Sequence, residues 1–102
     1  MYRGTTPSHT FTTATDVSEA AVVYITYKQH GQIVLEKTKE DITFASEGQA
    51  YTITVGLTQA ETLAFDDSPV AVQIRARFAD SRAIASNIIS APVNQILKDG
   101  EI

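Results

Sequence analysis

The chain of 102 residues contains no cysteine and no tryptophan, and only one methionine, three prolines and five glycines. Without cysteine it has no disulfide framework, no thiol nucleophile and no thiolate metal ligand. No apolar run approaches the roughly 20 residues that span a bilayer, and the opening Met1 to Thr5 lacks an apolar signal core. We therefore expect a protein that is made in a cytoplasm, has no membrane partner and is stabilised by packing alone.

Basic residues are also scarce, because eight Lys and Arg face twelve Asp and Glu for a net charge of −4. Contacts to phosphate need clustered Lys and Arg, so this balance argues against a nucleic-acid partner. Arg75, Arg77 and Arg82 are the one basic cluster. We interpret them as the solvated face and tip of a hairpin rather than as a phosphate site.

Alternating apolar residues are what the chain does have. Val70, Val72, Ile74, Ala76 and Phe78 are separated by single, mostly polar residues, as in a half-buried β-strand. Several other segments are rich in β-branched and aromatic residues or read at the same period. The predicted strands are His9–Thr13, Val22–Lys28, Ile33–Lys39, Ile42–Phe44, Tyr51–Leu57, Val70–Phe78 and Ala83–Val93.

Turn chemistry predicts how some of these strands connect. A three-residue loop, Gln29 to Gly31, places apolar residues opposite apolar residues in the hairpin that it closes, whereas a two-residue loop mixes the faces. Thr58 and Glu61 form a capping-box pattern, which predicts a helix of about two turns before Asp66-Asp67-Ser68-Pro69. The parity of apolar residues changes between Ile88 and Ile89, which indicates either a bulge or burial on both sides of that strand.

About seven short strands with one short helix predict a single all-β domain over residues 1–102, an antiparallel β-sandwich, with a small open β-barrel as the alternative. Residues 1–7 are predicted to form an extended arm without an apolar pattern, which packs on something else. Residues 96–102 are predicted to be a loosely held tail. The first strand carries neither proline nor charge, so we expect this strand and the arm to contact a neighbouring subunit.

No catalytic, metal-binding or cofactor-binding residue is predicted. His30 fits a turn and His9 lies among threonines without a nearby acid. The paired acids Glu40-Asp41 and Asp66-Asp67 offer too few ligands for calcium and are read as turns. Of the tyrosines, Tyr24 alone is expected to be exposed.

Four segments together resemble small proteins encoded in bacteriophages and prophages of Gram-positive bacteria. The segments are Tyr2–Pro7, Val23–Gln29, Leu57–Gln59 through Leu63–Phe65, and Val72–Arg75 followed by Ala85–Ile88. Those proteins are similar to the immunoglobulin-like N-terminal domain of phage baseplate upper proteins, which attaches a larger assembly to the tail. The resemblance implies an immunoglobulin-like fold and no catalytic residues.

These observations lead us to expect a non-enzymatic phage or prophage structural or assembly component, with a role in tail or baseplate attachment. Its expected partners are itself and other phage structural proteins, as a homo-oligomer. It is expected in the host cytoplasm when synthesised and then in the virion. The alternative is a stand-alone sugar- or peptide-binding β-sandwich module.

Overall fold

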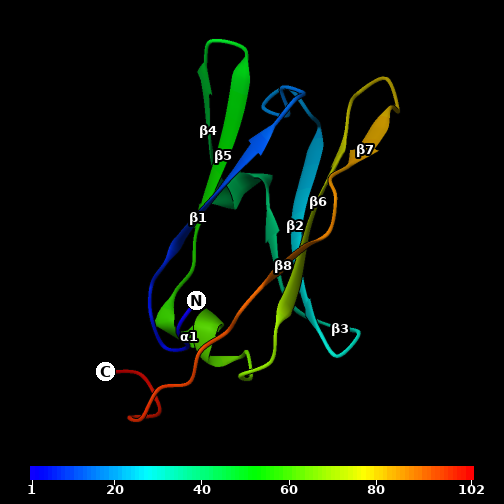
Figure 1. Cartoon of the computed structure of the whole chain (residues 1–102). Coiled ribbons are helices and arrows are strands. Elements are labelled where there is room, and N and C mark those ends of the chain that lie inside the picture. Colours follow the sequence, from blue (N-terminus) through cyan, green and yellow to red (C-terminus); the bar gives the residue numbers. More distant parts are fainter.

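The computed structural model describes all 102 residues as two antiparallel sheets with one short helix at one end (Figure 1). One sheet has the strand order β1-β5-β4, and the other has the order β3-β2-β6, followed by β7 and β8, which both pair with β6. The strands are β1 Ser8–Thr13, β2 Val22–Gln29, β3 Gln32–Thr38, β4 Ile42–Glu47, β5 Ala50–Gly56, β6 Val70–Arg77, β7 Ala83–Ala85 and β8 Ile89–Ala91; the helices are α1 Gln59–Leu63 and the 3-10 turn η1 Lys39–Asp41.

The two sheets share no strand, so the domain is a β-sandwich and not the small open barrel. The immunoglobulin fold places strands A, B, E and D in one sheet and C, F and G in the other, with C′ added beside C in variable-type domains. By chain order and sheet position, β1, β5 and β4 correspond to B, E and D. Strands β3, β2 and β6 correspond to C′, C and F, and the broken strand β7–β8 corresponds to G. The position of strand A, beside β1, is unfilled.

The core lies between the sheets and is built from the alternating residues. The predicted inward set of β6 is buried, with Val70 1% and Ile74 5% exposed. Val23, Ile25 and Tyr27 face it from β2, and Ile53 and Val55 face it from β5. Leu57 and Phe65, on either side of α1, close one end of the core.

The hairpin between β2 and β3 corrects the predicted loop. Gln29 pairs with Gln32, so the loop has two residues, and both of them, His30 at φ 52° and Gly31 at φ 73°, have the positive φ of a type I′ turn. The face mixing that argued against a two-residue loop is avoided by a bulge after Tyr27, which shifts the pairing by one residue and sets Tyr27 opposite Leu35. The positive φ of His30 agrees with the prediction of a turn histidine.

The hairpin that joins β6 to β7–β8 contains the bulge predicted from the change of parity between Ile88 and Ile89. Arg75 pairs with Ala85 and Val70 with Ala91, so the register differs by one residue between β7 and β8. Burial on both sides is the wrong alternative, since Ile88 is 68% exposed and Ile89 42% exposed. Strand β4 also runs to Glu47, past the end predicted for it.

Helix α1 begins with the predicted capping box. The amide of Glu61 donates to the hydroxyl of Thr58, and the amide of Thr58 donates to the carboxylate of Glu61. The helix is shorter than expected, because it ends at Leu63. No helix in the structure is long and apolar enough to cross a bilayer.

The N-terminal arm packs on its own domain, which corrects the expectation that it packs on another molecule. Tyr2 forms a parallel bridge with Asn94, beyond β8. The guanidinium of Arg3 donates to the carbonyls of Phe65 at 2.6 Å and Leu63 at 3.0 Å, just past and at the end of α1. The arm therefore caps the helix and closes this end of the sandwich.

Candidate interaction site

Strand β1 is an edge strand whose outer backbone groups are unused. The amide of Leu57 donates to the carbonyl of Pro7 at 2.9 Å, and these two residues continue the register that pairs Ser8 with Gly56. In an antiparallel ladder, alternate residues exchange hydrogen bonds with one neighbour. The odd-numbered residues of β1 therefore bond to β5, and Ser8, Thr10 and Thr12 turn their N–H and C=O groups to the open edge.

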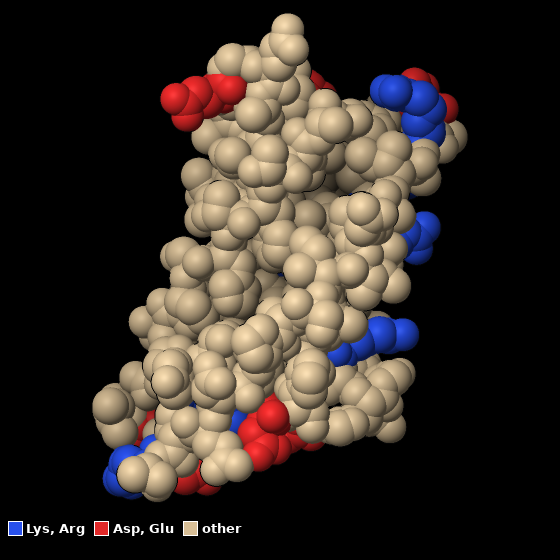
Figure 2. Space-filling view, in the orientation of Figure 1, with Lys and Arg blue, Asp and Glu red and all other residues tan.

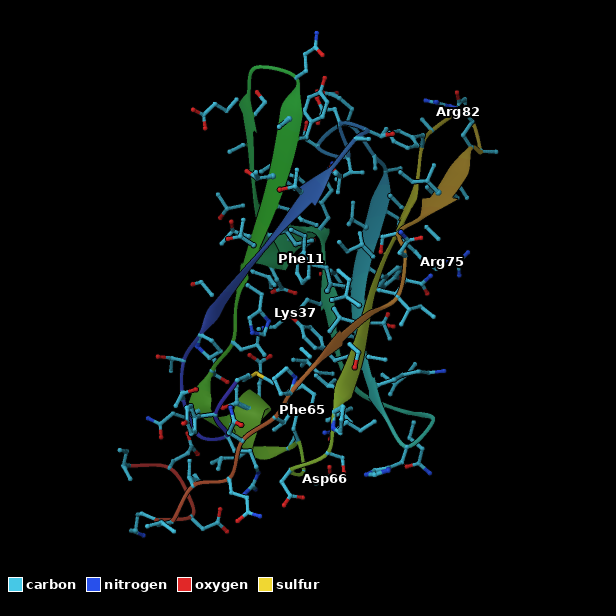
Figure 3. The ribbon with its side chains drawn as sticks, in the orientation of Figure 1. Phe11, Lys37, Phe65, Asp66, Arg75 and Arg82 are labelled. Atoms are coloured by element: carbon cyan, nitrogen blue, oxygen red, sulfur yellow. The ribbon has the colours of Figure 1, made fainter.

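Two cavities lie along this edge, between β1 on one sheet and β7–β8 on the other. The lower cavity, of about 280 Å³, has Phe11 on its β1 wall, Ile89 on its β8 wall and Tyr27 behind them. The upper cavity, of about 320 Å³, has Thr13 and Ile84 on its two walls and Val17 behind them. We call these two cavities and the edge of β1 the β1 groove. Figure 3 shows Phe11 between the two sheets, on this side of the molecule.

The β1 groove has no charged side chain. All residues that line the two cavities are apolar or neutral, apart from the titratable His9. In Figure 2 the Lys, Arg, Asp and Glu side chains on this face gather at the ends and along one side, and the middle, over β1 and β8, is uncharged. A ligand in the groove therefore meets apolar and hydroxyl side chains and free backbone groups. The one charge at the lower cavity is the amino terminus of Met1, whose ammonium donates to the carbonyl of Pro92.

His9 and Tyr27 form a hydrogen-bonded pair at the lower cavity, with 2.7 Å between Nδ1 and the phenolic oxygen. Burial, and then the positive charge of the chain's amino terminus, hold the pKa of His9 below its usual value. Burial, and then the charge of Glu61, raise the pKa of Tyr27. His9 is thus neutral and Tyr27 protonated near pH 7, and the pair adds no charge to the groove.

A second polar pair, Lys37 and Glu61, lies at the α1 end of the sandwich, where the side chain of Lys37 is 11% exposed and that of Glu61 25% exposed. The ammonium of Lys37 donates to the carboxylate at 2.8 Å and is 2.7 Å from its other oxygen. Burial by itself raises the pKa of Glu61, but the hydrogen bonds from Lys37 and Thr58, together with the Lys37 charge, outweigh it and hold that pKa below its usual value. This pair ties β3 to α1, and both charges are engaged.

The Lys37–Glu61 pair was not predicted from the sequence, although the alternation of residues in the predicted strand Ile33–Lys39 indicates it. Lys37 has the same parity as Leu35, an apolar residue of the same predicted strand. A lysine at an inward position calls for a buried acid. The Arg3 cap on α1 left no comparable signal.

The remaining candidates occupy turns and exposed faces. His30 donates from Nε2 to the carboxylate of Asp66 at 2.6 Å, and that carboxylate also accepts from the amide of Ser68. These hydrogen bonds, the one from Ser68 first, hold the pKa of Asp66 below its usual value. Asp67 accepts from Gln95. The Asp66–Pro69 segment is therefore a hydrogen-bonded turn.

The arginines lie where the hairpin interpretation placed them. Arg75 and Arg77 are exposed on the outer face of β6, and Figure 3 shows Arg75 and Arg82 on the side of the molecule away from β1. Arg82 is 3.0 Å from Asp80 and stacks over Phe78. Tyr24 is 41% exposed, as expected, and pairs with Arg75 across the strands. It is not the one exposed tyrosine, because Tyr2 is 58% exposed. Glu40 and Asp41 belong to the η1 turn.

Comparison with known proteins adds no relative. No family model, curated protein or solved structure matches the chain.

Proposed function

We propose that the protein is a non-enzymatic structural or assembly component of a phage or prophage particle that works through protein–protein contacts at the β1 groove. One observation carries the contact site: three residues of β1 present free N–H and C=O groups beside an uncharged apolar groove. An unprotected edge of this kind is a template for pairing with another chain. The phage assignment rests on the resemblance of the four sequence segments.

The other edge of the same sheet is a natural comparison. Since β5 uses its odd-numbered residues for β1, its even-numbered residues bond to β4, and Thr54 opposite Thr43 is such a pair. Residues Ile42, Phe44 and Ser46 of β4 therefore face the opposite edge. That edge ends in Glu47, so charge protects it in a way that β1 lacks.

The partner is a second copy of the chain or another structural protein of the particle, and the site of contact predicts a selective variant. Thr10→Pro removes one free edge donor and the hydroxyl hydrogen bond to Thr54, and leaves every backbone hydrogen bond to β5 in place. Ser46→Pro removes one free edge donor at the opposite edge. Both variants are expected to retain the circular dichroism spectrum of the parent protein.

The test is incorporation into particles made by the parent phage or induced prophage. We expect purified particles to contain the protein, the Ser46→Pro variant to be incorporated, and the Thr10→Pro variant to be left out. Particles that lack the parent protein would contradict the phage role. Equal incorporation of both variants would contradict the β1 site.

The stand-alone sugar- or peptide-binding module is the second candidate, and the two cavities beside a free strand edge are the observation that favours it. Genomic neighbourhood separates the candidates. Flanking capsid and tail genes favour the particle component, and flanking polysaccharide-utilisation genes favour the binding module.

A further inference from the structure

We infer that the β1 groove accepts a single extended, uncharged segment of a partner protein, which pairs antiparallel to β1 and fills the position of the missing strand A. This inference rests on the proposed function, because it names the kind of partner that the same groove takes. It follows from the direction of the neighbouring chain, the pattern of free backbone groups, the two cavities and the absence of charged side chains from their walls.

The direction comes from the N-terminal residues. The bridge between Tyr2 and Asn94 is parallel, so Met1 to Arg3 runs alongside the chain that leaves β8. In Figure 1, β1 runs upward and β8 runs downward. A strand laid along the same line as Met1 to Arg3, further up the groove, is therefore antiparallel to β1. An antiparallel pair of strands is also slightly more stable per residue than a parallel pair.

The backbone fixes which residues of the segment bond to β1. Ser8, Thr10 and Thr12 have both their side chains on the outer face and their free backbone groups at the edge. Residues directly opposite each other in an antiparallel pair project to the same face. The outward-facing residues of the segment therefore make the hydrogen bonds to β1, and the inward-facing ones do not.

The cavities and the outer face define the side chains. Inward residues of the segment enter the two cavities, whose walls include Phe11 and Ile89 below and Ile74 and Ile84 above. Aliphatic side chains fit there, whereas a lysine side chain would lose its hydration where no lining side chain carries an opposite charge. Outward residues of the segment extend the outer face of the sheet, where the hydroxyl oxygens of Thr10 and Thr54 lie 3.0 Å apart. Small hydroxyl side chains therefore suit these outward positions.

The space between the walls favours one strand over a second folded copy. Both cavities are bounded by β1 on one side and by β7–β8 of the same chain on the other. A second copy that offered its own β1 would bring β5 and its other sheet with it. A single segment enters without displacing β8.

The probe is a blocked peptide of about seven residues that alternates threonine with valine, a length typical of one strand. Binding is followed by amide shifts in the NMR spectrum and by the midpoint of thermal unfolding, which a ligand of the folded state raises. We expect saturable binding at up to millimolar peptide, with the amide shifts at Ser8–Thr13 and Ile89–Ala91.

Two altered peptides separate backbone pairing from side-chain fit. Methylation of the threonine amide nitrogens removes the donors that face β1 and is expected to abolish binding, whereas methylation of the valine nitrogens leaves those donors free. Replacing valine with lysine is expected to abolish binding as well. Equal binding of the two methylated peptides would overturn the inference.

Protein variants supply the matched controls. Thr10→Pro and Ile89→Lys are expected to weaken binding at least about tenfold, the loss of one good interaction. Ser46→Pro and Ile33→Lys, at exposed positions outside the groove, are expected to leave it unchanged. Unchanged binding by Thr10→Pro or Ile89→Lys would also overturn the inference.

Failure here is distinguishable from failure of the proposed function. If Thr10→Pro is left out of particles but no alternating peptide binds, the edge is used by a folded surface and the single-strand inference is wrong while the proposed function stands. A concentration-dependent dimer that Thr10→Pro abolishes and the peptide does not compete with would overturn it in favour of a second copy.

Discussion

The end of the sandwich at α1 and the side at the β1 groove treat their backbone groups in opposite ways. At the α1 end, side chains far away in sequence engage the carbonyls and amides of the helix and its flanking turn. Arg3 donates to the carbonyls of Leu63 and Phe65, and the side chain of Gln29 donates to the carbonyls of Asp66 and Ser68 and accepts from the amide of Asp66. At the β1 groove, the outer groups of three residues face the open edge.

This difference shows where stability and binding reside. The α1 end joins the arm, β2, β3 and the turn after the helix through long-range polar contacts, so a change there disturbs several segments. Strand β1 pairs only with β5, and its one side-chain hydrogen bond to the other sheet is the inward-facing His9–Tyr27 pair, away from the free edge groups. A partner can therefore occupy or leave the edge without breaking any contact that holds the sheets together.

The largest effect is expected in the core that underlies both regions. Ile74 is 5% exposed at the centre of β6, and Ile74→Ala is expected to cost about 2–5 kcal/mol, the range for truncation of a buried aliphatic side chain. Arg75→Ala, on the opposite face of the same strand, is expected to stay within about 0.5 kcal/mol. Urea denaturation measures both, and equal losses would show that the face assignment is wrong.

The second effect concerns the Lys37–Glu61 pair at the α1 end. Lys37→Met leaves the partly buried carboxylate of Glu61 without its counter-charge, and we expect a loss of about 1–3 kcal/mol. Adding Glu61→Gln to Lys37→Met should recover part of it, because the unpaired, partly buried charge is then gone. If the double variant loses the sum of the two single losses, the pair makes no favourable interaction.

The third effect tests the arm as part of the α1 end. Arg3→Ala removes two hydrogen bonds to carbonyls at the end of the helix, and we expect a loss of about 1–2 kcal/mol. Deletion of residues 2 to 7 should cost more, since it also removes the contacts of Thr5 and Pro7. The control is Arg82→Ala, whose exposed pair with Asp80 is expected to contribute little. A loss no larger than that of the control would mean that the arm does not stabilise the fold.

The sequence predicted the sheets well because their signal is local. Alternation in Val70–Phe78 identified the inward face of β6, and Thr58 with Glu61 identified the start of α1, from residues within a few positions of each other. The predicted length of the β2–β3 loop was wrong, because a bulge after Tyr27, outside the loop, brings the apolar faces of the two strands back into alignment despite the two-residue loop.

The contacts of the α1 end and the groove could not be read in this way. Arg3 meets carbonyls about sixty positions away, and the polar arm gives no local sign of them. The edge of β1 was predicted from the absence of charge and proline in one strand. The opposite wall of the β1 groove, on β7–β8, was not predicted, because its position depends on the bulge in that strand and on how the two sheets pack.

A smaller effect is expected from pH, again at the α1 end. The pKa of Glu61 is lower in the folded protein than its ordinary value of 4.5, so the folded state binds this proton less readily than the unfolded state. The stability that it contributes is fully present above about pH 5 and is lost as the pH falls through the folded pKa. Glu61→Gln should therefore lose less stability than the parent between pH 5 and pH 3. Parallel curves would show that other acids cause the acid sensitivity.

The smallest effect on stability is expected at the β1 edge, which completes the comparison. Thr12 is exposed on the outer face opposite Thr52, and no side-chain hydrogen bond joins the two. Thr12→Lys should therefore change the free energy of unfolding by less than about 0.5 kcal/mol. A lysine beside the free edge is nevertheless a device by which edge strands resist pairing, so the same variant should weaken binding of the alternating peptide. Thr43→Lys, on β4 at the far side of the sheet, is the matched control and should change neither quantity. A loss of stability from Thr12→Lys as large as that from Arg3→Ala would show that the edge supports the fold, and the contrast between the two regions would then be wrong.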